Sequence, residues 1–177
     1  MDLSRYDNSD FERGAPPWKE ACWTAVRCLF FQNPLPWPSA LRVELLRAFG
    51  AQIGNDVVIR ENVNISFPWR LTVGDHVWIG EDVGILSLAQ VTIESNCCIS
   101  QRAYLCTGSH DFRSETFDLI TKSITIRSGS WVAAGAIILP GVTVGPNSVV
   151  SAGSAVNRDV APSTTVRGNP ARVVEKS

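Results

Sequence analysis

The feature that most constrains the fold of this chain is an aliphatic residue at every sixth position over most of its length. The repeat positions form groups of three: Ile53, Ile59 and Ile65; Val73, Ile79 and Ile85; Ile93, Ile99 and Leu105; Ile126, Val132 and Ile138; Val144, Val150 and Val156. A step of six residues does not match the 3.6-residue turn of an α-helix, so successive aliphatic side chains would point to different faces of a helix. The repeat therefore predicts short strands in a coiled parallel sheet.

Each hexad has a second regular position, its fifth, which is often small or β-branched, as at Val57, Cys97 and Ser148. Polar or glycine-containing turns follow many of the aliphatic positions, as in 54–56 and 145–147. If the large side chain at the first position and the small one at the fifth both point inward, they suit the narrow interior of a triangular prism. In such a prism three hexads make one turn. We therefore predict about five coils.

The coils differ in length, and the additional residues fall at one place in each long coil. They come after the third hexad begins, at 67–72 in the first coil, 87–92 in the second and 108–123 in the third. In coils stacked in register these loops would project from the same edge, about one strand spacing (~4.8 Å) apart. That edge is where we expect a pocket, beside a protruding loop at 108–123.

The first fifty residues lack the repeat, so we expect a helical extension at 1–50 and a β-helix domain at 51–177. Residues 18–31 are mostly apolar and predict one helix, which is shorter than the ~20 residues of a membrane span. This helix could dock on protein or attach peripherally to a membrane surface. Ser39 is a candidate N-cap for a second helix over 40–49, which would cover the open strand edges of the first coil.

The bulk composition excludes several partners and sites. A net charge of −1 over 177 residues offers no basic footprint for nucleic acid. Five cysteines without a Cys-x-x-Cys pair, and a start without the layout of a signal peptide, indicate a cytoplasmic protein. With two histidines per chain, even a symmetric trimer cannot form the three-His zinc centre of a γ-type carbonic anhydrase, and we expect no metal.

Two segments carry a resemblance to a known family, WVAAGAIILPGV at 131–142 and VRGNPAR at 166–172. From about Gly50 to Val174 the chain resembles the hexapeptide-repeat acyltransferases, whose repeats form an all-β, left-handed parallel β-helix. Segments 98–101 and 104–111 are most similar to the WcaF-like branch of colanic acid and exopolysaccharide O-acetyltransferases, relatives of maltose and galactoside acetyltransferases. The resemblance implies acetyl-CoA as co-substrate, a glycan acceptor in polysaccharide biosynthesis, and a homotrimer with active sites between subunits.

His110 is the candidate catalytic base, because it lies at the root of the longest loop, whereas His76 lies in an ordinary turn. Moving an acetyl group from a thioester to a sugar hydroxyl requires a base that is largely unprotonated at neutral pH, which suits imidazole (pKa ~6.5). We expect direct transfer, with backbone N–H groups holding the oxyanion. Asp111 could orient the imidazole, contact the sugar or serve the turn alone.

The resemblance also assigns residues to a CoA groove: Trp131, Ala134, Gly135, Ala152, Asn157, Arg158 and Arg172. Arg172 is the clearest of these, because guanidinium pairs well with phosphate, while the small residues could instead serve repeat packing alone. Maltose and galactoside acetyltransferases contact the acceptor through an Asn for which this chain offers Ser87. Phe112, Arg113 and Phe117 in the long loop could shape the acceptor pocket.

Two alternatives to a polysaccharide O-acetyltransferase stay open. A xenobiotic acetyltransferase would act on a drug hydroxyl, and a non-catalytic β-helix scaffold would only bind partners. The apolar segment 18–31 favours a glycan on a lipid carrier, at the inner face of the cytoplasmic membrane.

Overall fold

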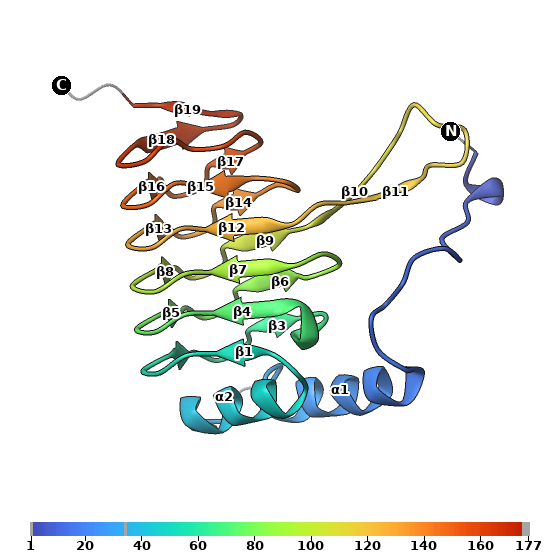
Figure 1. Cartoon of the computed structure of the whole chain (residues 1–177), viewed down its shortest axis with the longest axis horizontal. Coiled ribbons are helices and arrows are strands. Elements are labelled where there is room, and N and C mark those ends of the chain that lie inside the picture. Colours follow the sequence, from blue (N-terminus) through green and yellow to red (C-terminus); the bar gives the residue numbers. More distant parts are fainter. Residues whose placement is uncertain (1, 34, 175–177) are drawn as a thin grey trace.

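The main body of the molecule is a triangular solenoid of short parallel strands (Figure 1), in a computed structural model that describes residues 2–33 and 35–174. Sheet A contains β1 (Gln52–Ile53), β4 (Leu71–Val73), β7 (Val91–Ile93), β12 (Ile124–Ile126) and β15 (Thr143–Val144). Sheet B contains β2 (Val58–Ile59), β5 (Trp78–Ile79), β8 (Cys98–Ile99), β13 (Trp131–Val132), β16 (Val149–Val150), β18 (Thr165–Gly168) and β19 (Ala171–Val173). Sheet C contains β3 (Asn64–Ile65), β6 (Gly84–Leu86), β9 (Tyr104–Cys106), β14 (Ile137–Ile138) and β17 (Ala155–Val156).

The register of the sheets confirms the hexad repeat. Ile53 pairs with Val73 in sheet A, and Val73 pairs with Ile93 in the next coil. Every repeat position except Ile53, which is half-buried in the first coil, is buried, and so are the small fifth positions such as Ser148. The core is therefore a stack of aliphatic layers inside the prism, as the sequence predicts.

The solenoid has about six turns, one partial turn more than the sequence predicts. After Val156 the next sheet A contact comes at Val160, four residues on, where an isolated bridge joins it to Val144. Strand β18 then continues sheet B, and β19 folds back on it in antiparallel fashion. The six-residue count stopped at Val156 because the step from Val156 to Val160 is four residues, after which Val166 returns to the spacing of six.

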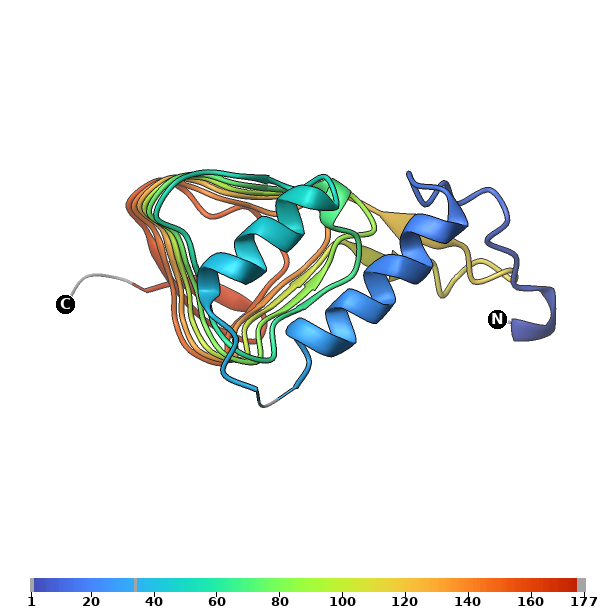
Figure 2. The same ribbon diagram turned by 90° about the horizontal axis from the view of Figure 1, so that it is seen from below.

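Two helices lie across the base of the solenoid, as Figure 2 shows from below. α1 (Pro17–Phe30) confirms the helix predicted over 18–31, and α2 (Ser39–Ala48) the one predicted over 40–49. The N-cap prediction was wrong, because Pro38 holds that position and Ser39 is the first helical residue. The Ser39 hydroxyl instead accepts a hydrogen bond from the Ile59 N–H, at the open edge of the first coil.

Side chains of the helices also donate hydrogen bonds to the carbonyl groups of the first coil that no neighbouring strand pairs. Each of the three strands of that coil receives one such side chain. Arg47 donates to the carbonyl of Ile53, Arg42 to that of Ile59 and Trp23 to that of Ile65. In the second coil the corresponding carbonyl, that of Val73, accepts instead from a backbone N–H of the preceding coil. The helices thus replace a missing coil, and Trp23 and Leu46 extend the same hydrophobic core.

Candidate active site

The three predicted loops project from one edge of the prism, between sheets C and A, which we call the loop edge. The first loop contains the short 3-10 helix η2 (Pro68–Arg70), and the second spans 87–90. The third is not an irregular loop but a β-hairpin, in which β10 (Gly108–His110) pairs with β11 (Leu119–Thr121) in antiparallel register. The hairpin extends far beyond the prism (Figure 1).

Within the hairpin, the His110 ring is oriented by Phe117. The two rings stack at 4.3 Å between centroids with an interplanar angle of 1°. The Nδ1 atom of His110 lies 2.9 Å from the carbonyl oxygen of Phe117. A carbonyl only accepts hydrogen bonds, so Nδ1 carries the proton, and in the neutral ring Nε2 presents a free lone pair. This is the tautomer that a general base acting through Nε2 requires.

The backbone of Phe117 is unusual, because its φ of 53° places a bulky residue in the left-handed region. Other non-glycine residues, such as His76 and Arg102, adopt the same conformation in turns of the solenoid, so it marks a tight turn. Here the residue in this conformation is the one whose carbonyl orients the imidazole.

Asp111 serves the turn of the hairpin in this structure. Its carboxylate accepts a hydrogen bond of 2.9 Å from the Arg113 backbone N–H, and its own N–H donates to the carbonyl of Asp118. The ring-orienting contact that the sequence offered to Asp111 is made by Phe117 instead. A contact between Asp111 and an acceptor sugar stays a prediction.

Ser87 is not available to an acceptor, which corrects the prediction from sequence. Its side chain is fully buried, with 0% of the residue exposed. The hydroxyl accepts from the Phe67 N–H at 2.9 Å and donates to the Phe67 carbonyl at 3.0 Å. Both hydrogen bonds of this hydroxyl therefore join the first two loops of the loop edge, and the hydroxyl does not face a pocket.

Phe112 and Arg113 lie near the hairpin tip. Phe112 is 69% exposed, and the guanidinium of Arg113 lies 5.5 Å from the centre of its ring. Both side chains extend into open space around a single copy of the chain, so any pocket that they shape needs a second surface.

The residues assigned to a CoA groove fall in separate places on one chain. Ala134, Gly135 and Ala152 lie in exposed turns on the edge between sheets B and C, and Trp131 lies beside them on sheet B, 48% exposed. A Cβ atom added to Gly135 would meet nothing within 4 Å, so this corner is open to a ligand. Asn157 and Arg158 are exposed on the loop edge, on the far side of sheet C.

Arg172 has a neighbour that the sequence analysis missed. Strands β18 and β19 place Arg167 directly opposite Arg172, and both are exposed. Like charges directly opposite one another destabilise an antiparallel pair. A pair of guanidinium groups in this position is therefore suited to a bound anion such as a phosphate.

A cavity of about 230 Å³ opens on the loop edge between α1 and the first two loops. Trp23, Phe67, Trp69 and Leu88 form its apolar walls, and Arg27 and Glu20 supply charged groups. Leu88 also packs under the root of the hairpin, because a Cβ atom on Gly108 would lie 2.6 Å from its Cδ1 atom. No pattern in the sequence predicts this cavity, because its walls come from segments that are distant along the chain.

Two further kinds of group concern metal ligands and cysteine thiols. Within residues 2–33 and 35–174, no group of three His, Cys, Asp or Glu side chains is arranged to hold a metal ion. Cys97 is buried in the core, and burial raises the pKa of its thiol, which disfavours the reactive thiolate.

Comparison with known proteins agrees with the geometry. A family model described as "Bacterial transferase hexapeptide (six repeats)" matches residues 123–158. The "Putative colanic acid biosynthesis acetyltransferase WcaF" of Escherichia coli K12 is 41% identical over 180 aligned positions, which cover 99% of this chain and 97% of that protein. This chain belongs to the hexapeptide-repeat acetyltransferases. Its similarity to WcaF extends through the N-terminal helices as well as the solenoid.

Solved structures of other hexapeptide-repeat acetyltransferases share the fold. A galactoside acetyltransferase in complex with coenzyme A superimposes with a TM-score of 0.83 at 26% identity, over 95% of this chain and 84% of that one. The acetyltransferase VCA0836 of Vibrio cholerae, in complex with acetyl coenzyme A, gives a TM-score of 0.80 at 28% identity, over 89% of this chain and 86% of that one.

Proposed function

We propose that this acetyltransferase moves the acetyl group of acetyl-CoA to a hydroxyl of a sugar or glycan in polysaccharide biosynthesis. The observation that carries the proposal is the hydrogen bond from Nδ1 of His110 to the carbonyl of Phe117, which leaves Nε2 free to act as a base. The 41% identity to WcaF supports the acceptor class, and the coenzyme complexes of related structures support the donor.

The proposed reaction is a direct transfer. Nε2 of His110 takes the proton of the acceptor hydroxyl as its oxygen attacks the acetyl carbonyl, and backbone N–H groups hold the oxyanion that forms. The tetrahedral intermediate then collapses, the carbon–sulfur bond breaks, and the imidazolium returns its proton to the sulfur of CoA. The products are the acetyl ester and free CoA, and no acyl-enzyme is formed.

The acceptor would reach His110 from the loop edge. The cavity lined by Trp69 and Leu88 lies on that edge, and Leu88 also contacts the root of the hairpin. Aromatic walls with a few charged groups are typical of small-molecule sites. Phe112, Arg113 and Asp111 on the hairpin would close the acceptor site from the other side.

The CoA groove would be completed by a second copy of the chain. The corner with Ala134, Gly135 and Ala152 and the loop edge with His110, Asn157 and Arg158 lie on opposite sides of sheet C. Packing the corner of one copy against the loop edge of the next would bring the two sets together. The Arg167 and Arg172 pair would then meet the phosphates, with Trp131 beside the groove.

The outward faces of the solenoid support a homotrimer. The outward residues of sheet A are polar: Gln52, Thr72, Thr92, Thr125 and Thr143. Sheets B and C instead present exposed apolar side chains, with Trp78 at 50%, Tyr104 at 38% and Ile137 at 39% exposure. A closed three-fold ring uses two different faces of each subunit, which matches two adjoining apolar faces.

This assembly can be tested with charges placed on single faces. Trp78→Asp and Ile137→Asp should shift the protein from trimer to monomer in analytical ultracentrifugation, and Thr92→Asp on sheet A should leave the trimer intact. A monomeric wild type, or dissociation caused by Thr92→Asp alone, would refute it.

We place the protein in the cytoplasm, with peripheral attachment to the inner face of the membrane through α1. No helix within the described residues combines the length and apolar character needed to cross a bilayer. The outer face of α1 nevertheless exposes Trp18 at 68% and Leu29 at 60%, with Cys22 and Ala25 between them. Such a face is suited to the lipid interface, where a lipid-linked glycan would be presented.

Vesicles test this attachment directly. The wild type should co-sediment with phosphatidylcholine and phosphatidylglycerol liposomes, and Trp18→Glu with Leu29→Glu should abolish the association. If the intact protein stays in the supernatant, the membrane role is wrong.

The function itself is tested by mixing the protein with acetyl-CoA and a panel of sugars, oligosaccharides and drug hydroxyls. Release of the CoA thiol together with a mass gain of one acetyl group on a sugar or glycan supports the proposal. Transfer only to a drug hydroxyl would instead indicate a xenobiotic enzyme. A non-catalytic scaffold would release no thiol above the background rate of hydrolysis.

A further inference from the structure

The hairpin that carries His110 has little support of its own. Strands β10 and β11 form a separate two-stranded sheet with three residue pairs. An isolated two-stranded hairpin is at best marginally stable in water. The position of His110 therefore depends on contacts that the hairpin makes with other parts of the molecule.

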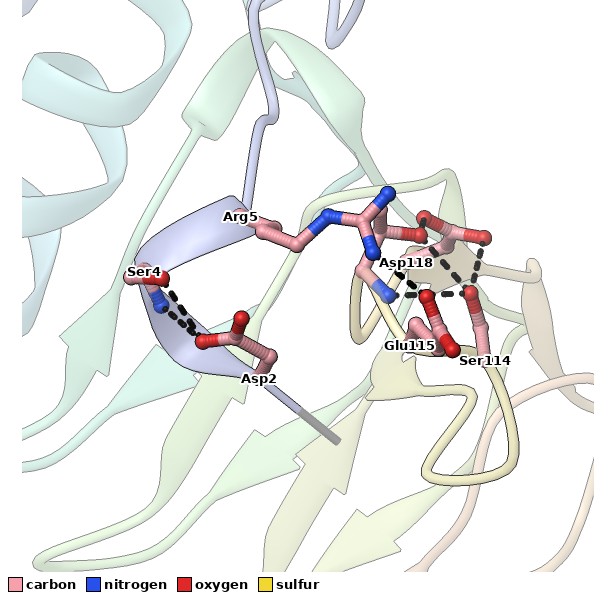
Figure 3. A network of polar contacts seen from close by, with 7 residues as sticks. Asp2, Ser4, Arg5, Ser114, Glu115 and Asp118 are labelled. Atoms are coloured by element: carbon pink, nitrogen blue, oxygen red, sulfur yellow. Dashed lines mark hydrogen bonds and ion pairs between the residues drawn. The ribbon is translucent and has the colours of Figure 1, made fainter.

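The N-terminal segment supplies such contacts at the hairpin tip. It runs from α1 along the outside of the molecule to the hairpin (Figure 1). The backbone N–H of Asp2 donates to the carbonyl of Glu115 at 2.8 Å, and the Arg5 guanidinium pairs with the Glu115 carboxylate. The Asp2 carboxylate also caps the 3-10 turn η1 (Leu3–Arg5) through the N–H and hydroxyl of Ser4 (Figure 3).

Tyr6 extends this contact to the catalytic ring. Its ring meets His110 edge to face at 5.5 Å between centroids and Phe117 at 6.5 Å, both at an interplanar angle of 64°. The His110 imidazole is thus bounded by two aromatic residues, one from the hairpin and one from the N-terminal segment. Aromatic pairs of this geometry attract one another beyond the effect of their buried area.

The same segment is also anchored at its other end, on the first loop of the loop edge. The Trp69 indole donates to the carbonyl of Arg13 at 2.8 Å, and Phe11 lies 6.4 Å from Phe67 between ring centroids. Residues 7–10 bridge the two anchors. The segment therefore connects the stable base of the solenoid to the otherwise weakly supported hairpin.

The relative strength of these contacts identifies the residue that matters most. Arg5 and Glu115 are 58% and 75% exposed, and an ion pair so exposed contributes little to stability. Tyr6 is half-buried and touches the catalytic ring itself. Tyr6 is therefore the residue through which the segment acts on His110.

We infer that residues 2–6 form an N-terminal clamp that positions the His110 imidazole for catalysis, with Tyr6 as its positioning residue. The inference rests on the proposed role of His110 as the base. The clamp keeps the hairpin, and with it the His110 ring, in its orientation, and the contact is made by the aromatic ring of Tyr6.

Three substitutions in the full-length protein test the clamp. Tyr6→Ala should lower kcat by about 10- to 100-fold, because a misplacement of ~1 Å can cost about 100-fold, while KM for acetyl-CoA stays unchanged. Tyr6→Phe retains the ring edge and should restore wild-type kcat. Leu35→Ala removes a side chain that is 53% exposed and lies outside the clamp, and as the control it should keep the wild-type kcat.

A readout independent of activity is hydrogen exchange of the hairpin. The Asp111 N–H, which donates to the Asp118 carbonyl across the hairpin, should exchange faster in Tyr6→Ala than in Tyr6→Phe or the wild type. Unchanged exchange together with unchanged kcat in Tyr6→Ala would overturn the clamp.

The double variant separates this inference from the proposed function. If Tyr6 acts through His110, adding Tyr6→Ala to His110→Ala should leave the residual turnover within about twofold. A further large loss in that background would assign Tyr6 another role and overturn the clamp. Full activity of His110→Ala alone would instead overturn the proposed function.

Discussion

Nδ1 of His110 and the carbonyl oxygen of Phe117 lie 2.9 Å apart, between residues that face each other across the base of the hairpin turn. This hydrogen bond sets the tautomer of the ring, because the carbonyl has no proton to give. A buried carboxylate would set the same tautomer but would also raise the basicity of the imidazole. The carbonyl sets it without adding charge to the site.

Ser87 joins two loops rather than contacting the acceptor, so its removal should affect stability and not acceptor affinity. Ser87→Ala leaves the Phe67 N–H and carbonyl unpaired in a buried position, which should cost about 1–3 kcal/mol in the free energy of unfolding. Chemical denaturation and acceptor KM measure the two effects. A large rise in KM at unchanged stability would return Ser87 to the acceptor site.

Arg42 is a buried charge that closes the base of the solenoid. It is 1% exposed, it donates to the carbonyls of Phe30 and Ile59, and burial lowers the pKa of its guanidinium. Arg42→Ala should cost about 2–5 kcal/mol in the free energy of unfolding, through unpaired carbonyls and a cavity. Arg102→Ala, which breaks an ion pair whose arginine is 80% exposed, should change stability by less than about 1 kcal/mol.

Glu94 links the coil before the hairpin to the coil after it, and it gives the stability a pH dependence. Burial alone would raise the pKa of this carboxyl, but hydrogen bonds from the Ser128 N–H, the Arg127 guanidinium and the Ser128 hydroxyl outweigh burial and hold the pKa below its usual range. The lowered pKa stabilises the fold above the unfolded-state pKa of about 4.3, and this contribution is lost as pH falls through the folded-state pKa.

Glu94→Gln should therefore lower the free energy of unfolding at pH 7 by about 1 kcal/mol. The difference from the wild type should shrink as the pH falls below about 4.3, because the carboxyl is then protonated in the unfolded state, and it should vanish below the folded-state pKa, where the carboxyl is neutral in both states. Urea denaturation at a series of pH values measures it, with Glu12→Gln at an exposed position as control. A difference that stays constant down to pH 3 would contradict this account of Glu94.

Arg167 and Arg172 repel one another in the free protein and should share a phosphate group in the complex. Arg167→Ala and Arg172→Ala should each weaken CoA binding by about tenfold, because a hydrogen bond to a charged group contributes ~1.5 kcal/mol or more. Each variant should be at least as stable as the wild type at low salt, since it removes a like-charge pair. Isothermal titration calorimetry and thermal unfolding distinguish this from a purely structural role, which would lower stability.

The sequence predicted the fold well because the hexad repeat is a local, periodic signal. Repeat positions such as Ile79 and Val132 must point into the core for each coil to pack on the next. The additional residues 108–123 fall between two hexads, so they must project from one edge of the prism. The same local reasoning failed at Ser39, whose hydroxyl bonds the edge of the first coil rather than its own helix. The Ile59 N–H needs a hydrogen-bond acceptor, and this tertiary contact outweighed the local preference of serine for the N-cap position.

The site was predictable only in part, because its geometry depends on contacts between distant segments. His110 followed from its loop, but the residue that orients it is Phe117, to which the sequence assigned only a place in the acceptor pocket. Tyr6 carries no motif, and its contact with His110 joins the first residues of the chain to the third coil. The pairing of Arg167 with Arg172 required the register of the last two strands.

The central claim is that His110 is the base of an acetyl transfer, and a paired measurement on one variant tests it most directly. CoA release at saturating acetyl-CoA and acceptor should fall by about 10²–10⁴-fold in His110→Ala, while the Kd for CoA from calorimetry stays at the wild-type value. His76→Ala, at a side chain that is 61% exposed in a turn of the second coil, should match the wild type in both quantities. Wild-type turnover in His110→Ala would contradict the account.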